Sequence, residues 1–173
     1  MLHTTARKSV RRVILTFMVL ILAGLWYTMA AQTDTLTVGS TTGAAGQRQS
    51  ATISLTNTHK IAGLQLALKI GAKTVMIDTL GATTRTEGMM VQWNAQNGKI
   101  LMIDFALKHM IAPGGGPILN VKYYVASTAA ARTVGLTAEG VVLSNLDGRS
   151  VPVVVKNGQF VIESPAAPGR KSN

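Results

Sequence analysis

The side chains that most often bind metals or act as nucleophiles are few and scattered in this sequence. The chain has no cysteine, and its histidines are His3, His59 and His109. Without cysteine, thiolate catalysis, iron–sulfur clusters and cysteine zinc sites are excluded. The histidines are too far apart for an HExxH helix, and no cluster of carboxylates accompanies them. We therefore expect no metal site and no cofactor.

The acidic and hydroxyl side chains form no recognisable catalytic pattern either. There is no GxSxG nucleophile motif with histidine and aspartate partners. Asp78, Glu87, Asp104 and Glu139 are widely spaced, and nothing places two of them across a sugar, as glycoside hydrolysis requires. Asp147 in NLDGR lacks the further oxygen ligands of a calcium loop, so it indicates a turn. The sequence therefore predicts no catalytic residues and a protein that is not an enzyme.

The net charge of +10 is concentrated near the two ends of the chain. Six basic residues lie there: Arg7, Lys8, Arg11, Arg12, Arg170 and Lys171. Without these six, 11 of the 17 basic residues remain against seven acids, a net charge of +4. The remaining basic residues are scattered singly, unlike the concentrated basic face of a nucleic-acid-binding protein. We expect no nucleic-acid partner.

Residues 1–31 have the pattern of an export signal. The basic segment RKSVRR precedes the apolar run VILTFMVLILAGLWYTMAA, which ends in small residues. The pattern predicts a hydrophobic helix that is either a cleaved signal peptide or an uncleaved signal anchor, since Val13 to Ala31 is close to the ~20 residues that span a bilayer. Either way, the remainder would be secreted or anchored outside the cytoplasmic membrane, with membrane contact only through this segment.

From Thr33 to Glu163 the sequence alternates apolar and polar residues with a period of two. The clearest runs are Gln49–Asn57, residues 60–71, Lys99–Leu107 and Ile118–Ala126. Asn-Gly and Asp-Gly turn signals separate such runs, and no long segment has a helical apolar stripe. Strands with one apolar face must bury that face against another sheet. We therefore predict an all-β, two-sheet sandwich of about nine strands over residues 33–163.

The alternation also predicts which side chains fill the sandwich. The expected centre consists of the apolar residues Leu64, Leu66, Leu68, Leu101, Ile103, Phe105, Val121 and Tyr123. On this register Ile100, Met102 and Asp104 point outward. Phe105→Ala is then expected to cost ~3–5 kcal/mol of stability, as large-to-small core changes do.

The succession of these segments resembles the cohesin domain, the module that binds dockerins. The resemblance extends from about Leu36 to Ile162. It rests on LTVGSTTGAAGQRQSATISLTN, KIAGLQLALKIGAKTVMIDTLG, NGKILMIDFA, PILNVKYYVAS and VVLSNLDGRSVPVVVKNGQFVI, in that order. The resemblance implies a jelly-roll sandwich whose sheet face recruits a dockerin-type or other protein partner. It also implies an extracellular, polysaccharide-related assembly, with any calcium held by the dockerin.

The resemblance further implies where a partner binds. Family contact positions match the strands Gly63–Lys69, Val91–Asn94 and Ile100–Asp104. The implied partner-binding residues are Gly63, Gln65, Ala67, Asn94, Met102 and Asp104. Gly63 and Gln65 stand where the family often has Asn or Asp, and Asp104 stands where an apolar residue is usual.

Two alternatives remain at this stage. A carbohydrate-binding module would use Trp93, the only tryptophan outside the leader, to stack on a sugar, so a polysaccharide is a possible ligand. A structural accessory domain of a cell-surface complex needs no ligand site. Residues 164–173, SPAAPGRKSN, have the composition of a disordered tail.

Overall fold

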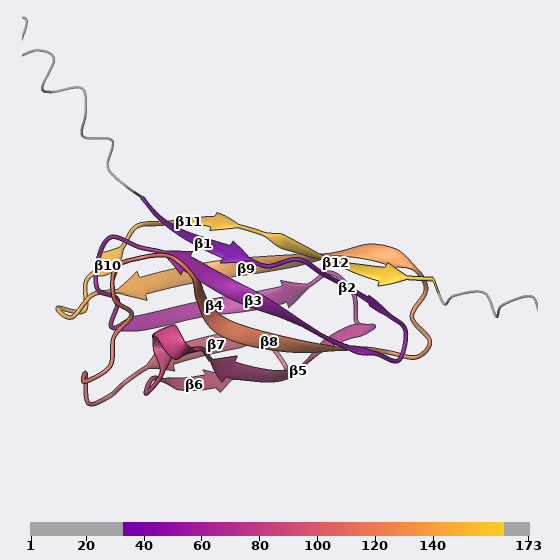
Figure 1. Ribbon diagram of the computed structural model, residues 1–173, viewed down its shortest axis with the longest axis horizontal. Coiled ribbons are helices and arrows are strands. Elements are labelled where there is room, and N and C mark those ends of the chain that lie inside the picture. The colour runs from indigo at the N-terminus through magenta and orange to yellow at the C-terminus, as the bar shows by residue number, and fades with distance from the viewer. Residues whose placement is uncertain (1–32, 165–173) are drawn as a thin grey trace, which may run out of the picture. The chain divides into compact units, whose positions relative to one another are not determined.

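The computed structural model describes residues 33–164, and this part of the chain is built almost entirely from β-strands (Figure 1). Its one helical element is the short 3-10 helix η1 (Thr84–Thr86). No helix within this described range is long and apolar enough to cross a membrane. The hydrophobic helix predicted for residues 1–31, and the predicted tail from residue 165 on, lie outside the described residues.

The strands form two sheets, and the strands of both sheets lie along similar axes (Figure 1). The five-stranded sheet has the order β11 (Val153–Lys156), β1 (Asp34–Val38), β3 (Arg48–Thr56), β8 (Pro117–Val125) and β5 (Val75–Ala82). The seven-stranded sheet has the order β2 (Thr41–Ala44), β12 (Gly158–Glu163), β9 (Arg132–Ser144), β4 (Gly63–Ile70), β7 (Lys99–Ile103) and β6 (Met90–Trp93), with β10 (Ser150–Val151) also paired to β9. The predicted all-β sandwich is confirmed.

The buried faces of the two sheets meet in one apolar core. On β4, Leu64, Leu66 and Leu68 are buried while Gln65 and Lys69 are exposed, which confirms the predicted alternation. The largest side chains of the core belong to Tyr123 on β8 and Phe160 on β12, whose ring centroids lie 5.7 Å apart at 78°. This edge-to-face pair joins the two sheets, since each strand belongs to a different sheet.

The predicted register of β7 is wrong. Ile100 and Met102 are fully buried, whereas Leu101 on the same strand is exposed. The whole run is apolar, so alternation alone does not reveal which set faces the core, and a shift of one residue exchanges the two faces.

Phe105 is also wrong as a core residue, because 74% of its surface is exposed. The strand ends at Ile103, and residues 105 and 106 form a turn instead of continuing to Leu107. The loss of ~3–5 kcal/mol predicted for Phe105→Ala therefore does not apply. Phe160 is the phenylalanine at the centre of the core.

The strand count also differs from about nine. The structure has twelve strands among the described residues, several of them as short as β2 and β10. Pro152 separates β10 in the seven-stranded sheet from β11 in the five-stranded sheet. Proline has no backbone N–H for a ladder hydrogen bond, so it suits a point where the chain leaves one sheet for the other.

A single arginine holds the connection between β7 and β8 to β3. The Arg85 guanidinium donates hydrogen bonds to backbone oxygens of Leu55, Ala112, Gly114 and Gly116, and to the side-chain oxygen of the buried Asn57. Burial lowers the pKa of Arg85 from its ordinary value. The Gly114 and Gly116 carbonyls also accept the backbone N–H groups of Asn57 and Leu55. The guanidinium therefore adds to the hydrogen bonds that already attach this connection to the end of β3.

Arg85→Ala should lower the free energy of unfolding by about 3 kcal/mol, because hydrogen bonds to a charged group contribute about 1.5–3 kcal/mol each and relaxation recovers part of the loss. Urea denaturation measures this change. The exposed Arg132→Ala is the control and should stay within about 0.5 kcal/mol of the original chain. Equal stabilities of the two variants would contradict this role for Arg85.

Candidate partner-binding face

Four neighbouring strands of the seven-stranded sheet, β9, β4, β7 and β6, present aligned side chains on their outer side, which we call the β9-β4-β7-β6 face. The strand register aligns Val142, Gln65, Leu101 and Gln92 in one row across the four strands. A second row contains Ser144, Gly63, Ile103 and Met90, and a third contains Glu139, Ala67 and Lys99. Among the described residues, the exposure of Gln65, Leu101 and Gln92 shows that the first row faces solvent.

The β9-β4-β7-β6 face is unusually apolar for a solvent-exposed sheet. Leu101, Val142 and Met90 are 36%, 45% and 37% exposed. The outer face of the five-stranded sheet instead carries mainly hydroxyl groups along β1 and β3, from Thr35, Thr37, Ser50, Thr52 and Ser54. Exposed apolar side chains that are contiguous across neighbouring strands are typical of a surface that binds a partner.

A shallow hollow of about 240 Å³ lies within this face. Its lining consists of Gln65, Gln92, Trp93, Asn94, Lys99, Ile100 and Leu101. Three of these carry amide groups, which both donate and accept hydrogen bonds, around an apolar patch at Leu101. Such a hollow has the size for one inserted side chain of a protein partner.

The structure brings four of the residues implied by the resemblance to this face, namely Gly63, Gln65, Ala67 and Asn94. Gln65 and Asn94 line the hollow, although the side-chain oxygen of Asn94 also accepts a hydrogen bond from the Gln96 N–H at 2.9 Å. Gly63 lies in the second row but is itself buried, and a Cβ there would lie 2.9 Å from Ser144 Oγ.

Met102 is wrong as a surface contact, because its side chain is fully buried in the core. The residue that takes its place on the face is Leu101. Sequence reasoning also missed Val142 on β9, Gln92 and Met90. The alternation of side chains in β9 could have pointed to Val142. However, the strand has a bulge near Gly140, whose φ is +56°, and the bulge changes which residues face outward beyond it.

Asp104 organises the loop that follows β7. Its carboxylate accepts hydrogen bonds from the backbone N–H groups of Ala106, Lys108 and His109, each at 2.9 Å, and lies 3.0 Å from His109 Nδ1. These N–H groups, that of His109 foremost, lower the pKa of Asp104 from 3.8 to about 2.

The contribution of Asp104 to stability should depend on pH. Because the pKa is lower in the folded than in the unfolded chain, the ionised carboxylate stabilises the fold above pH 3.8 and ceases to do so as the pH falls towards 2. Thermal denaturation of the original chain and of Asp104→Asn should show a difference at pH 7 that shrinks as the pH falls to 2. A difference that is constant with pH would argue against this linkage.

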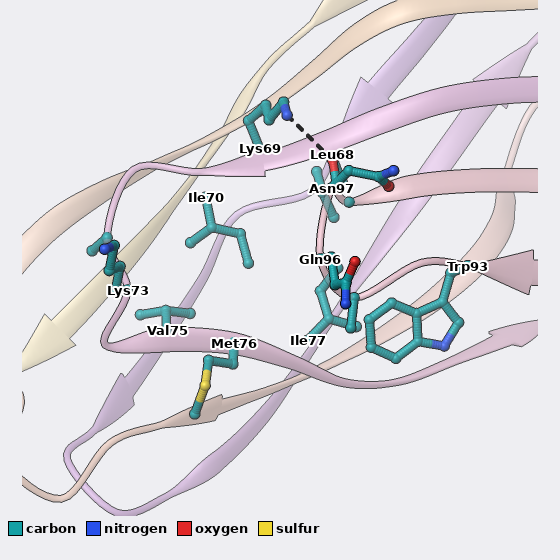
Figure 2. Close-up of a pocket in the computed structure, with 13 residues that line it drawn as sticks. Leu68, Lys69, Ile70, Lys73, Val75, Met76, Ile77, Trp93, Gln96 and Asn97 are labelled. Atoms are coloured by element: carbon teal, nitrogen blue, oxygen red, sulfur yellow. Dashed lines mark hydrogen bonds between the residues drawn. The ribbon is translucent and has the colours of Figure 1, made fainter.

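Trp93 points to the inner side of β6, where it packs against the edge of the core. It lines a cleft of about 470 Å³ at one end of the sandwich, together with residues of β4, β5 and the β6–β7 turn. Figure 2 shows the indole beside Gln96 and Ile77, while Lys69 reaches across to the Asn97 carbonyl, to which its Nζ donates at 3.2 Å. The indole is half-buried and is the one aromatic ring lining this cleft.

Among residues 33–164, no group of three or more His, Asp or Glu side chains is arranged to hold a metal ion. His59 lies near Asp34, with 3.8 Å between His59 Nδ1 and the carboxylate, and His109 is held by Asp104. Both imidazoles thus belong to loop contacts.

Comparison with known proteins agrees with this architecture. A non-cellulosomal cohesin from Archaeoglobus fulgidus is 22% identical with a TM-score of 0.65, over 76% of this chain and 92% of that one. A chain of a type I cohesin–dockerin complex from Clostridium thermocellum is 14% identical with a TM-score of 0.67, over 76% of this chain and 100% of that one. The seventh ScaB type I cohesin from Pseudobacteroides cellulosolvens is 19% identical with a TM-score of 0.64, over 82% and 99%.

At these identities the solved structures establish the fold. No curated protein sequence matched the chain. The family model of the cohesin domain matches residues 35–162, which include the described strands from β1 to β12 almost completely. The protein therefore belongs to the cohesin domain family.

Proposed function

We propose that this chain is a non-catalytic binding module that recruits a dockerin-type protein partner through the β9-β4-β7-β6 face. The observation that carries the proposal is the row formed by Val142, Gln65, Leu101 and Gln92, which is exposed, partly apolar and continuous across four strands. Membership of the cohesin family supports it, as do solved cohesins of similar fold that are found in complexes with dockerins.

The chemistry of the face suits a protein partner better than a small molecule. A sheet face is broad and shallow, so it offers contact area without enclosing a ligand, whereas small molecules bind in concave sites. The apolar side chains of Leu101 and Val142 supply the buried centre of an interface, and the amides of Gln65 and Gln92 supply hydrogen bonds around it.

The test is capture of dockerin modules by the immobilised full chain. A panel that includes dockerins of Clostridium thermocellum and Acetivibrio cellulolyticus is passed over the chain with calcium and then with a chelator. We expect at least one module to bind with calcium and to dissociate without it, because dockerins hold calcium in their own loops. Absence of binding across a broad panel would overturn the proposal.

The export of the chain belongs to the same proposal. The basic and apolar pattern of residues 1–31 supports a secreted or membrane-anchored protein, and a cohesin module outside the cell would serve a polysaccharide-related assembly. Cell fractionation with an antibody against residues 33–164 tests the location. Recovery in the cytoplasm alone would contradict it.

Carbohydrate binding is a second candidate, favoured by the cleft beside Trp93. Lys69, Lys73, Gln96 and Asn97 supply polar groups around an apolar floor in that cleft. Affinity electrophoresis in gels containing soluble polysaccharides tests this candidate. Retardation that disappears in Trp93→Ala would support it, and unretarded migration would exclude the tested polysaccharides.

A further inference from the structure

We infer that the loop of residues 104–110, which we call the Asp104 loop, is a rigid apolar anchor that extends the partner-binding face. Phe105 and Leu107 would insert into an apolar recess of the partner. The inference rests on the proposed function, since it names a contact of the same interface and the chemistry of the partner surface that it requires.

The first argument is the position of the loop. It follows directly from Ile103, the last residue of β7, which pairs with Gly63 on β4 and with Met90 on β6. The loop thus leaves the sheet at the end of the second row of the face. Phe105 is 74% exposed, and Leu107 is 45% exposed. Two large apolar side chains are thus exposed in a loop that continues directly from a strand of the apolar sheet face.

The second argument is that the loop is held in one conformation although its tip faces solvent. The Asp104 carboxylate accepts three backbone N–H groups, and the Leu107 N–H donates to the Asp104 carbonyl at 3.0 Å. Beyond the loop, Ile111 and Ile61 exchange two backbone hydrogen bonds of 2.9 and 3.0 Å. Both ends of the loop are therefore attached to the fold.

The loop is also packed against a neighbouring segment. The His109 ring lies so close to Gly88 that a Cβ on that glycine would be 2.5 Å from it. Gly88 has a φ of +84°, a conformation that glycine adopts without cost. This contact joins the Asp104 loop to the segment that leads into β6.

Leu107 has a φ of +53°, the one positive value for a residue other than glycine among residues 33–164. A leucine in this region costs of order 1–3 kcal/mol and persists only where the surroundings enforce it. Neither this strain nor the exposure of Phe105 contributes to stability. Both become useful if a preordered apolar tip binds a partner, because little conformational entropy is then lost on binding.

The charges around the loop indicate what should surround the recess. Lys108 belongs to the loop, and Lys60 precedes Ile61, which pairs with Ile111 just after the loop. The acid Glu87 precedes Gly88, against which the His109 ring lies. The Asp104 carboxylate is already occupied by N–H groups. The partner surface should therefore be an apolar recess bordered mainly by carboxylates.

The experiment measures the affinity of the full chain for the dockerin module captured from the panel. The anchor variant is Phe105→Ala. Its matched control is Val154→Ala, which removes an exposed apolar side chain from β11 of the other sheet. Phe105→Ala should weaken binding at least about 30-fold without changing the melting temperature, whereas Val154→Ala should stay within about twofold.

A separate pair of variants tests the role of Asp104 as a positioning residue. Asp104→Ala should weaken binding about tenfold because the loop loses its order, and Asp104→Asn should recover most of that loss, because its amide oxygen still accepts N–H groups. Equal binding by both variants and the original chain would overturn the positioning role.

The outcomes separate the two proposals. If a dockerin binds and Phe105→Ala binds equally well, the anchor is overturned while the proposed function stands. If no dockerin binds, both are overturned. If the original chain dimerises in sedimentation experiments and Phe105→Ala does not, the loop binds a second copy of this chain, which also overturns the inference.

Discussion

Leu101→Glu should weaken the binding of a dockerin partner by at least about 100-fold. Leu101 lies in the first row of the face, between Gln65 and Gln92, and beside the shallow hollow. A carboxylate at this point would have to lose its water on binding without gaining a partner cation, and the apolar contact would be lost as well. Titration calorimetry with the captured dockerin measures the change.

The fold should tolerate this change, because Leu101 points to solvent. Val154→Glu is the matched control, since it introduces the same charge at an exposed apolar position of the five-stranded sheet. Its affinity should stay within about twofold of the original. If Leu101→Glu binds as well as the control, the partner does not use the β9-β4-β7-β6 face.

Met102→Arg would give a misleading result in the same assay. Its side chain is fully buried, so an arginine would place an unpaired charge in the core. Loss of capture by that variant would report unfolding. Leu101→Glu avoids this ambiguity, although the two residues are neighbours in the sequence.

Phe160→Ala should lower the free energy of unfolding by ~3–5 kcal/mol, as expected for a fully buried phenylalanine. The loss combines the transfer of the ring with the cavity left opposite Tyr123, its edge-to-face partner on the other sheet. Urea denaturation monitored by circular dichroism measures the change.

Phe105→Ala is the matched control, because it removes the same side chain from a solvent-exposed loop. It should change the free energy of unfolding by less than about 0.5 kcal/mol. If both variants lost equal stability, the assignment of Phe160 to the core and of Phe105 to the surface would be wrong.

Much of the sandwich could be predicted from the alternation of side chains. On β4 the apolar set is separated by polar or small residues, so the buried face was unambiguous: Leu64, Leu66 and Leu68 are buried as expected. The order of the strand segments also sufficed to indicate the cohesin family, which the family model confirms for residues 35–162.

The candidate site was predicted less well, because it depends on register. In KILMIDFAL both alternating sets are apolar over the length of the strand, so local sequence does not decide which set faces inward. The decision comes from pairing: β7 lies between β4 and β6, and it aligns Leu101 with the outward-facing Gln65. Because the predicted register of β7 was inverted, the sequence analysis placed Met102 on the partner-binding face and Leu101 in the core.

The sequence by itself determined the class of fold and the family, because both depend on local periodicity and on the order of the segments. Only the tertiary structure decided that Phe160 is buried and Phe105 exposed, and that Asp104 closes a loop. The physical reason is that burial and hydrogen bonding depend on where strands end and how they pair, and these are set by contacts between residues far apart in the chain.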